Sequence, residues 1–96
     1  MTEQDFLKLL QEVAKKAKPF HADLKPIDKM DMPFVDAGLD SLDLLMCTMY
    51  LCEIYDVEDE KSKEMHAAGP QECWDFLNEN GRRKPESFEQ AMGWIQ

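Results

Sequence analysis

The stretch DAGLDSLDLL, residues 36–45, sets one serine between two aspartates at the point where an apolar run begins. Two interpretations of Ser41 follow. Serine and aspartate are good helix N-caps, because their side-chain oxygens accept hydrogen bonds from the first backbone N–H groups of a helix. A hydroxyl at a helix N-terminus can also be a point of covalent attachment, because the unpaired N–H groups and the positive end of the helix dipole favour a phosphodiester there. For a three-residue motif alone, the cap is the commoner explanation.

The chain before this stretch predicts one helix followed by a long loop. Thr2 is suited to cap a helix over residues 3–17, and Pro19 is suited to end it. The apolar residues that recur at helical spacing there are Phe6, Leu9, Leu10, Val13 and Ala17. Residues 18–39 contain three prolines and form a loop longer than the usual connection, with room for a short helical turn. The apolar residues expected to pin this loop to the core are Leu24, Ile27, Met30, Phe34, Val35 and Leu39.

The chain after the stretch predicts further helices and no strands. A second helix starts at Asp40 or Ser41, runs to about Tyr55, and is apolar on most sides. One of its apolar faces is formed by Leu42, Leu45, Met46 and Met49. Such a helix is either central in the fold or presents an apolar face to another molecule. Three shorter helices are expected near residues 60–67, 70–80 and 85–95. The pattern predicts an all-α bundle with a long first loop and an additional C-terminal helix.

Length and composition limit what the chain can do. Its 96 residues form one domain with a modest core, in which a deep pocket of enzyme size is not expected. No apolar run reaches the ~18 residues of a membrane span, and the N-terminus lacks a basic start and an apolar signal stretch. We therefore expect a cytoplasmic protein without membrane insertion. The three cysteines, Cys47, Cys52 and Cys73, are expected to be buried reduced thiols.

The charge is concentrated in the middle of the chain. Residues 23–60 hold eleven acidic and two basic residues and so carry the whole net charge of −9, while the remainder is neutral. Such a field repels nucleic acid and attracts basic protein surfaces. Because the acidic region surrounds Ser41, we interpret it as a docking surface for protein partners.

Sequence motifs for independent catalysis or metal binding are absent. There is no glycine-rich phosphate loop and no HExxH motif, and no Ser-His-Asp arrangement can be built from the spacing. His21 and His66 are isolated from each other and from the cysteines, so we expect surface or loop residues and no metal site. Carboxylates are abundant, but they lie in a stretch that looks solvated, whereas a general acid needs burial to raise its pKa.

Residues 34–57, FVDAGLDSLDLLMCTMYLCEIYDV, resemble the prosthetic-group region of acyl carrier proteins. The shared order is an apolar-acidic lead, a turn of Leu-Gly type, Asp-Ser-Leu, a long helix, and an aromatic residue with an aliphatic one shortly after, here Tyr55-Asp56-Val57. The similarity extends more loosely over residues 3–80. Asp-Ser-Leu alone is a weak signal, but the same motif in this order, length and charge context is a strong one.

The resemblance implies a four-helix bundle in residues 1–81 that carries 4′-phosphopantetheine on Ser41. A phosphopantetheinyl transferase would attach the group from coenzyme A. Asp40 matches the family aspartate that helps position the metal ion during this transfer, and Leu42 matches the residue that packs against the transferase. The arm's terminal thiol would hold acyl groups as thioesters. The chain itself would be a monomeric carrier and not an enzyme.

The sequence also departs from the family pattern. On the second helix, Met46, Cys52 and Ile54 stand where outward acids are often found in fatty-acid carriers, and Asp59-Glu60 replaces a typical Ile-Pro. We therefore expect acyl-loading and acyl-processing enzymes with basic or partly apolar docking surfaces. The expected partner-binding residues are Asp43, Met46, Glu53 and Asp56. Residues 82–96 are an extension that is expected to be helical and to pack on the bundle. Fatty-acid, polyketide-like and other specialised pathways all remain open.

Three alternatives remain beside the carrier. The chain can be a helical interaction module in which Ser41 is only an N-cap, and modification of Ser41 separates this alternative from the carrier. A peptidyl or aryl carrier shares the arm and differs only in its cargo. A hydrolase that uses Ser41 would require esterase activity in the unmodified protein, with loss of that activity in Ser41→Ala.

Overall fold

The computed structural model describes residues 1–17 and 24–95, and in this part of the chain all regular structure is helical. The elements are α1 (Glu3–Ala17), the 3-10 helix η1 (Phe34–Ala37), α2 (Ser41–Tyr55), α3 (Asp59–Ser62), α4 (Pro70–Asn80) and α5 (Phe88–Gly93). The predicted all-α class and the bounds of the first helix are confirmed. The predicted helix stop at Pro19 and the expected surface position of His21 lie outside the described residues.

Two of the predicted helices are shorter than expected. The helix expected near residues 60–67 is a single turn, Asp59–Ser62, which has no side-chain cap and buries none of its residues. The turn itself therefore gains no stability from burial, and the core contact of this region comes from Met65, which lies beyond the end of the helix. The last helix spans Phe88–Gly93 instead of residues 85–95, because Ser87 is its N-cap and accepts a hydrogen bond from the Gln90 N–H at 3.1 Å.

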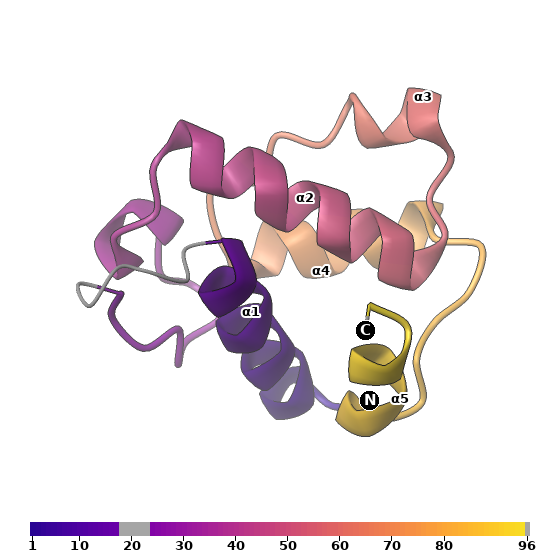
Figure 1. Cartoon of the computed structure of the whole chain (residues 1–96), viewed down its shortest axis with the longest axis horizontal. Coiled ribbons are helices and arrows are strands. Elements are labelled where there is room, and N and C mark those ends of the chain that lie inside the picture. The colour runs from indigo at the N-terminus through magenta and orange to yellow at the C-terminus, as the bar shows by residue number, and fades with distance from the viewer. Residues whose placement is uncertain (18–23, 96) are drawn as a thin grey trace.

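The core forms where α1, α2 and α4 meet. Figure 1 shows α1 crossing α2, with α4 on the far side of α2. Phe6 of α1 is fully buried and makes edge-on ring contacts with Tyr55 of α2 and Trp74 of α4, at centroid distances of 6.5 and 4.9 Å. The other fully buried large side chains at this junction are Leu9, Val13, Leu51, Ile54 and Leu77. Each such side chain stabilises the fold by about 1.5–3 kcal/mol through its burial.

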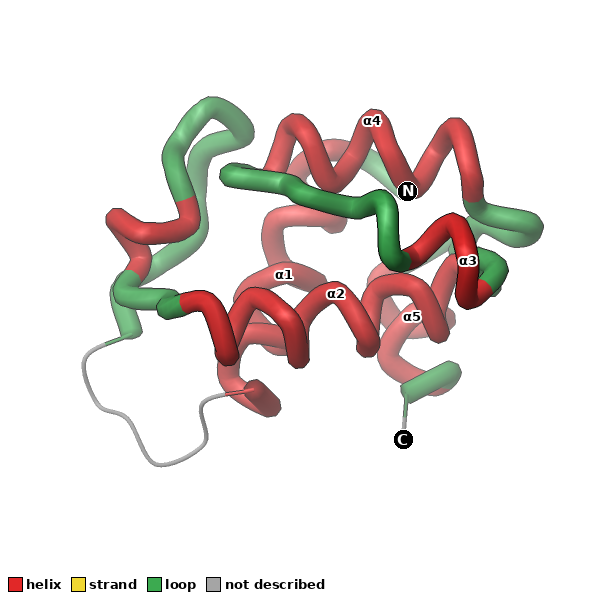
Figure 2. Tube along the Cα trace, turned by 90° about the horizontal axis from the view of Figure 1, so that it is seen from above, coloured by secondary structure: helices red, strands yellow, loops and turns green. Residues whose placement is uncertain are grey.

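The long first loop is attached to the bundle by hydrogen bonds that its backbone N–H groups donate. The Ile27 N–H donates to Gln11 Oε1 at 2.6 Å, and the Phe34 N–H donates to the Ala68 carbonyl at 2.7 Å. Ile27, Phe34 and Leu39 are buried, as predicted, but Val35 is 72% exposed and does not contact the core as expected. Figure 2 shows η1 at the same end of the molecule as the first turn of α2, so the loop delivers the chain directly to Ser41.

The C-terminal segment returns to the bundle. Helix α5 lies beside the N-terminal end of α1 (Figure 1), where Lys8 approaches the ring of Phe88 and Ala91 is fully buried. The Arg83 guanidinium stacks on the ring of Trp94 at 4.1 Å. The C-terminal segment is therefore packed against α1 and is held together by the Arg83–Trp94 stack.

Candidate functional site

The first turn of α2 is capped by aspartates. Asp40 has an extended backbone (φ −95°, ψ −177°), and its Oδ1 accepts a hydrogen bond from the Asp43 N–H at 2.9 Å. In return, Asp43 Oδ2 accepts a hydrogen bond from the Asp40 N–H at 3.1 Å, which completes a capping box. The N-cap is therefore Asp40. The interpretation of Ser41 as the cap is wrong, because Ser41 is the first residue inside the helix.

The Ser41 hydroxyl has no role in forming the helix. Its side chain is exposed, and within the described residues it makes no hydrogen bond. The neighbouring backbone is nevertheless well fixed. Leu39 is buried two residues before it, and Gly38 adopts the left-handed conformation (φ 90°) that closes η1. The structure thus holds a solvent-facing hydroxyl on a rigid support at a helix N-terminus.

An open groove of about 610 Å³ begins at Ser41, and we call it the Ser41 groove. One wall is α2, through Leu44, Leu45 and Thr48, and the other wall is the segment 62–68. Lys63 and His66 also line it, and no acidic side chain does. Ser41 and His66 thus line the same groove, which could not be predicted from the sequence because the two residues are 25 positions apart.

The side of α2 that faces solvent is apolar. Leu42, Leu45 and Met49 are 68%, 57% and 59% exposed, and we call these three residues the outer apolar face. Met46, predicted to lie on the same face, is half-buried. Of the two possibilities for an apolar helix, α2 therefore shows both: one side lies in the core and the other is open to solvent.

A second groove, of about 780 Å³, lies at the C-terminal end of α2, and we call it the acidic groove. Its acidic lining residues are Glu53, Asp56, Glu58, Asp59 and Glu60. The arginines Arg82 and Arg83 also line it. Glu53 is twelve residues from Ser41 on one helix, a separation of about 18 Å along the axis.

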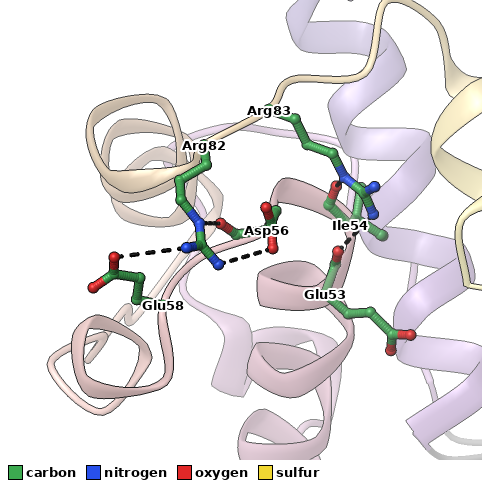
Figure 3. A network of polar contacts seen from close by, with 6 residues as sticks. All are labelled: Glu53, Ile54, Asp56, Glu58, Arg82 and Arg83. Atoms are coloured by element: carbon green, nitrogen blue, oxygen red, sulfur yellow. Dashed lines mark hydrogen bonds and ion pairs between the residues drawn. The ribbon is translucent and has the colours of Figure 1, made fainter.

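The two arginines hold the C-terminal end of α2 (Figure 3). Arg82 binds the Asp56 carboxylate at 3.1 Å and the Glu58 carboxylate at 3.6 Å, and its Nε donates to the Asp56 carbonyl at 2.9 Å. Arg83 donates to the carbonyls of Ile54 at 2.8 Å and Glu53 at 3.0 Å. These carbonyls belong to the last turn of α2, where few backbone N–H partners remain, and the Glu53 carbonyl also accepts a hydrogen bond from the Asp56 N–H at 3.4 Å.

The predicted partner-binding residues do not share one surface. Glu53 and Asp56 are exposed and both line the acidic groove. Asp43 was expected to point outward, but it is only 9% exposed because its carboxylate is part of the capping box. Met46 lies between these positions and is half-buried.

The interior offers little free space. A cavity of about 10 Å³ lies between α1, α2 and the long loop, and its lining includes Leu10, Phe34, Leu51 and Cys73. This volume holds about one water-sized group. This cavity is too small for a hydrocarbon chain.

The three thiols are buried, as predicted. Burial raises the pKa of Cys52 to about 11, and burial together with the nearby Asp43 charge raises the pKa of Cys47 to about 12. Burial also raises the pKa of Cys73. These thiols stay protonated near neutral pH and are poor nucleophiles.

Among residues 1–17 and 24–95, no group of three or more His, Cys, Asp or Glu side chains is placed to hold a metal ion. The helices in the same ranges are all too short or too polar to cross a membrane.

The chain was also compared with known proteins. No family model, curated protein or solved structure matches it.

Proposed function

We propose that this chain is an acyl carrier protein that is modified with 4′-phosphopantetheine on Ser41. The single observation that carries the proposal is the position of Ser41: an exposed hydroxyl at the start of α2 that the helix does not use, because Asp40 and Asp43 form the cap. A serine retained only for capping would accept a hydrogen bond from a backbone N–H, as Ser87 does in α5.

The residues around Ser41 fit the prosthetic group. The hydroxyl is open to solvent and to the Ser41 groove, whose lining contains no acidic side chain that would repel a phosphodiester. Ser41 Oγ would bond to the phosphorus of the phosphopantetheinyl group of coenzyme A. The pyrophosphate bond would break, adenosine bisphosphate would leave, and the hydroxyl proton would pass to a base of the transferase. Once attached, phosphopantetheine supplies a terminal thiol that carries acyl groups as thioesters.

The exposure of Asp40 and Leu42 supports a contact of both residues with the transferase. Asp40 is exposed, so its carboxylate is open to the metal ion of the transfer reaction that the family resemblance implies. Leu42 is 68% exposed next to Ser41, and burial of this side chain against the enzyme would favour the complex. Both residues are available without any change in the fold.

The two surfaces of α2 suggest how acyl-loading and acyl-processing enzymes dock. The outer apolar face lies near Ser41 and suits an apolar patch on the partner, whereas the acidic groove lies at the far end and suits a basic patch. Asp43 belongs to neither surface, because it is buried in the cap. The fatty-acid, polyketide-like, peptidyl and aryl classes of cargo share the same arm.

A second candidate function is an interaction module without a prosthetic group. The observation in its favour is the outer apolar face, which is exposed whether or not Ser41 is modified. This candidate assumed that Ser41 serves as the N-cap of α2, but the N-cap is Asp40.

Intact mass spectrometry tests the proposal. The chain is incubated with coenzyme A, magnesium and a broad-specificity phosphopantetheinyl transferase. We expect the mass of one phosphopantetheinyl group to be added to wild type and to Ser87→Ala, a matched helix-start serine, but not to Ser41→Ala. If folded wild-type protein gains no mass, the carrier proposal fails and the interaction module takes its place.

A further inference from the structure

The Ser41 groove has a charge opposite to that of the molecule. The chain has a net charge of −9 with histidine counted as neutral, yet the charged side chain that lines this groove is the cation Lys63, and the imidazole of His66 lies in the same lining. The acidic groove, which shares Ser62 with it, is lined by five acidic residues. The Ser41 groove therefore favours an anion, whereas the acidic groove disfavours one.

The two basic side chains are not neutralised by carboxylates. In the described part of the chain, neither Lys63 nor His66 makes an ion pair, whereas Lys61 pairs with Glu64 at 3.6 Å and Arg82 pairs with Asp56. Both side chains are exposed and line the groove that starts at Ser41. Their N–H groups can therefore donate to an anion carried by that serine.

The remaining lining of the Ser41 groove is mostly apolar. It includes Leu44, Leu45, Met65, Ala67 and Ala68. The wall from Ser41 to Thr48 is about 10 Å long, since each helical residue advances about 1.5 Å. A ligand that is anionic at the Ser41 end and less polar beyond it matches this lining.

We propose that Lys63 and His66 bind the phosphodiester attached to Ser41 and so direct the pantetheine arm along the Ser41 groove. This inference rests on the proposed function. It assigns a ligand-binding role to two residues that have no role in the helix cap or in the acidic groove. The two side chains are positioning residues, because they hold the arm and do not act on its cargo.

NMR spectroscopy of the full chain before and after modification tests the inference. In wild type, we expect the modification to shift the backbone amide signals of residues 62–68 as well as those of the first turn of α2. In the double variant Lys63→Gln, His66→Gln, we expect the shifts of residues 62–68 to fall at least twofold while those beside Ser41 persist. Lys61→Gln is the matched control, because Lys61 is a nearby lysine outside the groove lining, and it should behave as wild type.

A second measurement on wild type avoids any effect of the substitutions on folding. Raising the salt concentration from about 0.05 M to about 0.5 M should reduce the shifts of residues 62–68, because salt screens exposed charges. Shifts confined to the first turn of α2, or shifts that the double variant and salt leave unchanged, overturn the inference. The mass of each sample separates the two proposals: without a mass gain both fail, and with a mass gain but no groove shifts only this one fails.

Discussion

Asp40, Ser41 and Asp43 occupy the N-cap, the first and the third positions of α2. The sequence placed the helix start correctly to within one residue but left the cap open between Asp40 and Ser41, because both residue types are good N-caps. The sequence does contain a pattern that identifies Asp40 as the cap. Asp43 lies three residues after Asp40, which is the spacing of a capping box, whereas the residue three positions after Ser41 is Leu44.

Substitution at the two positions separates capping from attachment. Asp40→Ala should lower the free energy of unfolding by about 1 kcal/mol, because the Asp43 N–H loses its acceptor. Ser41→Ala should change it by less than about 0.5 kcal/mol, because an exposed side chain without hydrogen bonds is lost. Urea unfolding followed by circular dichroism measures both. A larger loss for Ser41→Ala would contradict the assignment of the cap.

Gly38 is a second position where one residue shapes the site. Its φ of 90° is unfavourable for residues with a Cβ, so Gly38→Ala should lower the free energy of unfolding by about 1–2 kcal/mol. Gly93→Ala is the matched control, because an added Cβ there meets no atom within 4 Å and alanine favours the helix. The same urea experiment checks this pair, and equal losses would argue against strain at Gly38.

Helix α2 illustrates what periodicity cannot provide. Its apolar residues cover most of its circumference, so the sequence predicted a helix but did not identify its buried side. Of the predicted face of Leu42, Leu45, Met46 and Met49, Met46 is half-buried and the other three residues are exposed. The buried residues of α2 include Cys47, Leu51, Cys52, Ile54 and Tyr55. The choice between two apolar sides depends on the positions of α1 and α4, which contact α2 from distant parts of the sequence.

The contacts at the C-terminal end of α2 also could not be predicted from the local sequence. Arg83 donates to the carbonyls of Glu53 and Ile54 and stacks on Trp94, so Arg83→Ala should lower the free energy of unfolding by about 1–3 kcal/mol. Lys84→Ala, an exposed neighbour, should change it by less than about 0.5 kcal/mol. Thermal and urea unfolding measure the two variants. Equal stability of both variants would show that the contacts of Arg83 do not stabilise the fold.

The charge distribution of the whole molecule could be predicted only in part. The sequence shows that residues 23–60 hold the net charge, and the acidic groove lies at the end of that region. The sequence does not show that Arg82 returns to Asp56 and Glu58, or that Lys63 and His66 line the same groove as Ser41. The first arrangement depends on where α4 ends relative to α2, and the second depends on the path of residues 62–68, which form no helix beyond Ser62.

The buried thiols predict how the stability of the whole molecule depends on pH. The pKa values of Cys52 and Cys47 are raised from 9.0 to about 11 and about 12, and the pKa values of Cys73 and Tyr55 are also raised. Above pH 9 the unfolded chain loses these protons while the folded chain keeps them, so the unfolded state is favoured as the pH rises. The contribution of these groups to the free energy of unfolding should therefore be constant below about pH 8 and should fall between about pH 9 and 12.

The contribution of one thiol can be isolated by comparing wild type with Cys52→Ala. Each pKa unit corresponds to about 1.4 kcal/mol, so Cys52 alone should account for a loss of about 2–3 kcal/mol once the pH exceeds its folded pKa. The variant starts from a lower stability, because a buried side chain is shortened, but it should lose less stability per pH unit above pH 9. Urea unfolding of both proteins from about pH 8 to about pH 11 provides the two slopes. Equal slopes would mean that Cys52 has the same pKa in the folded and unfolded chains. That result would contradict the raised pKa that we expect from the burial of this thiol.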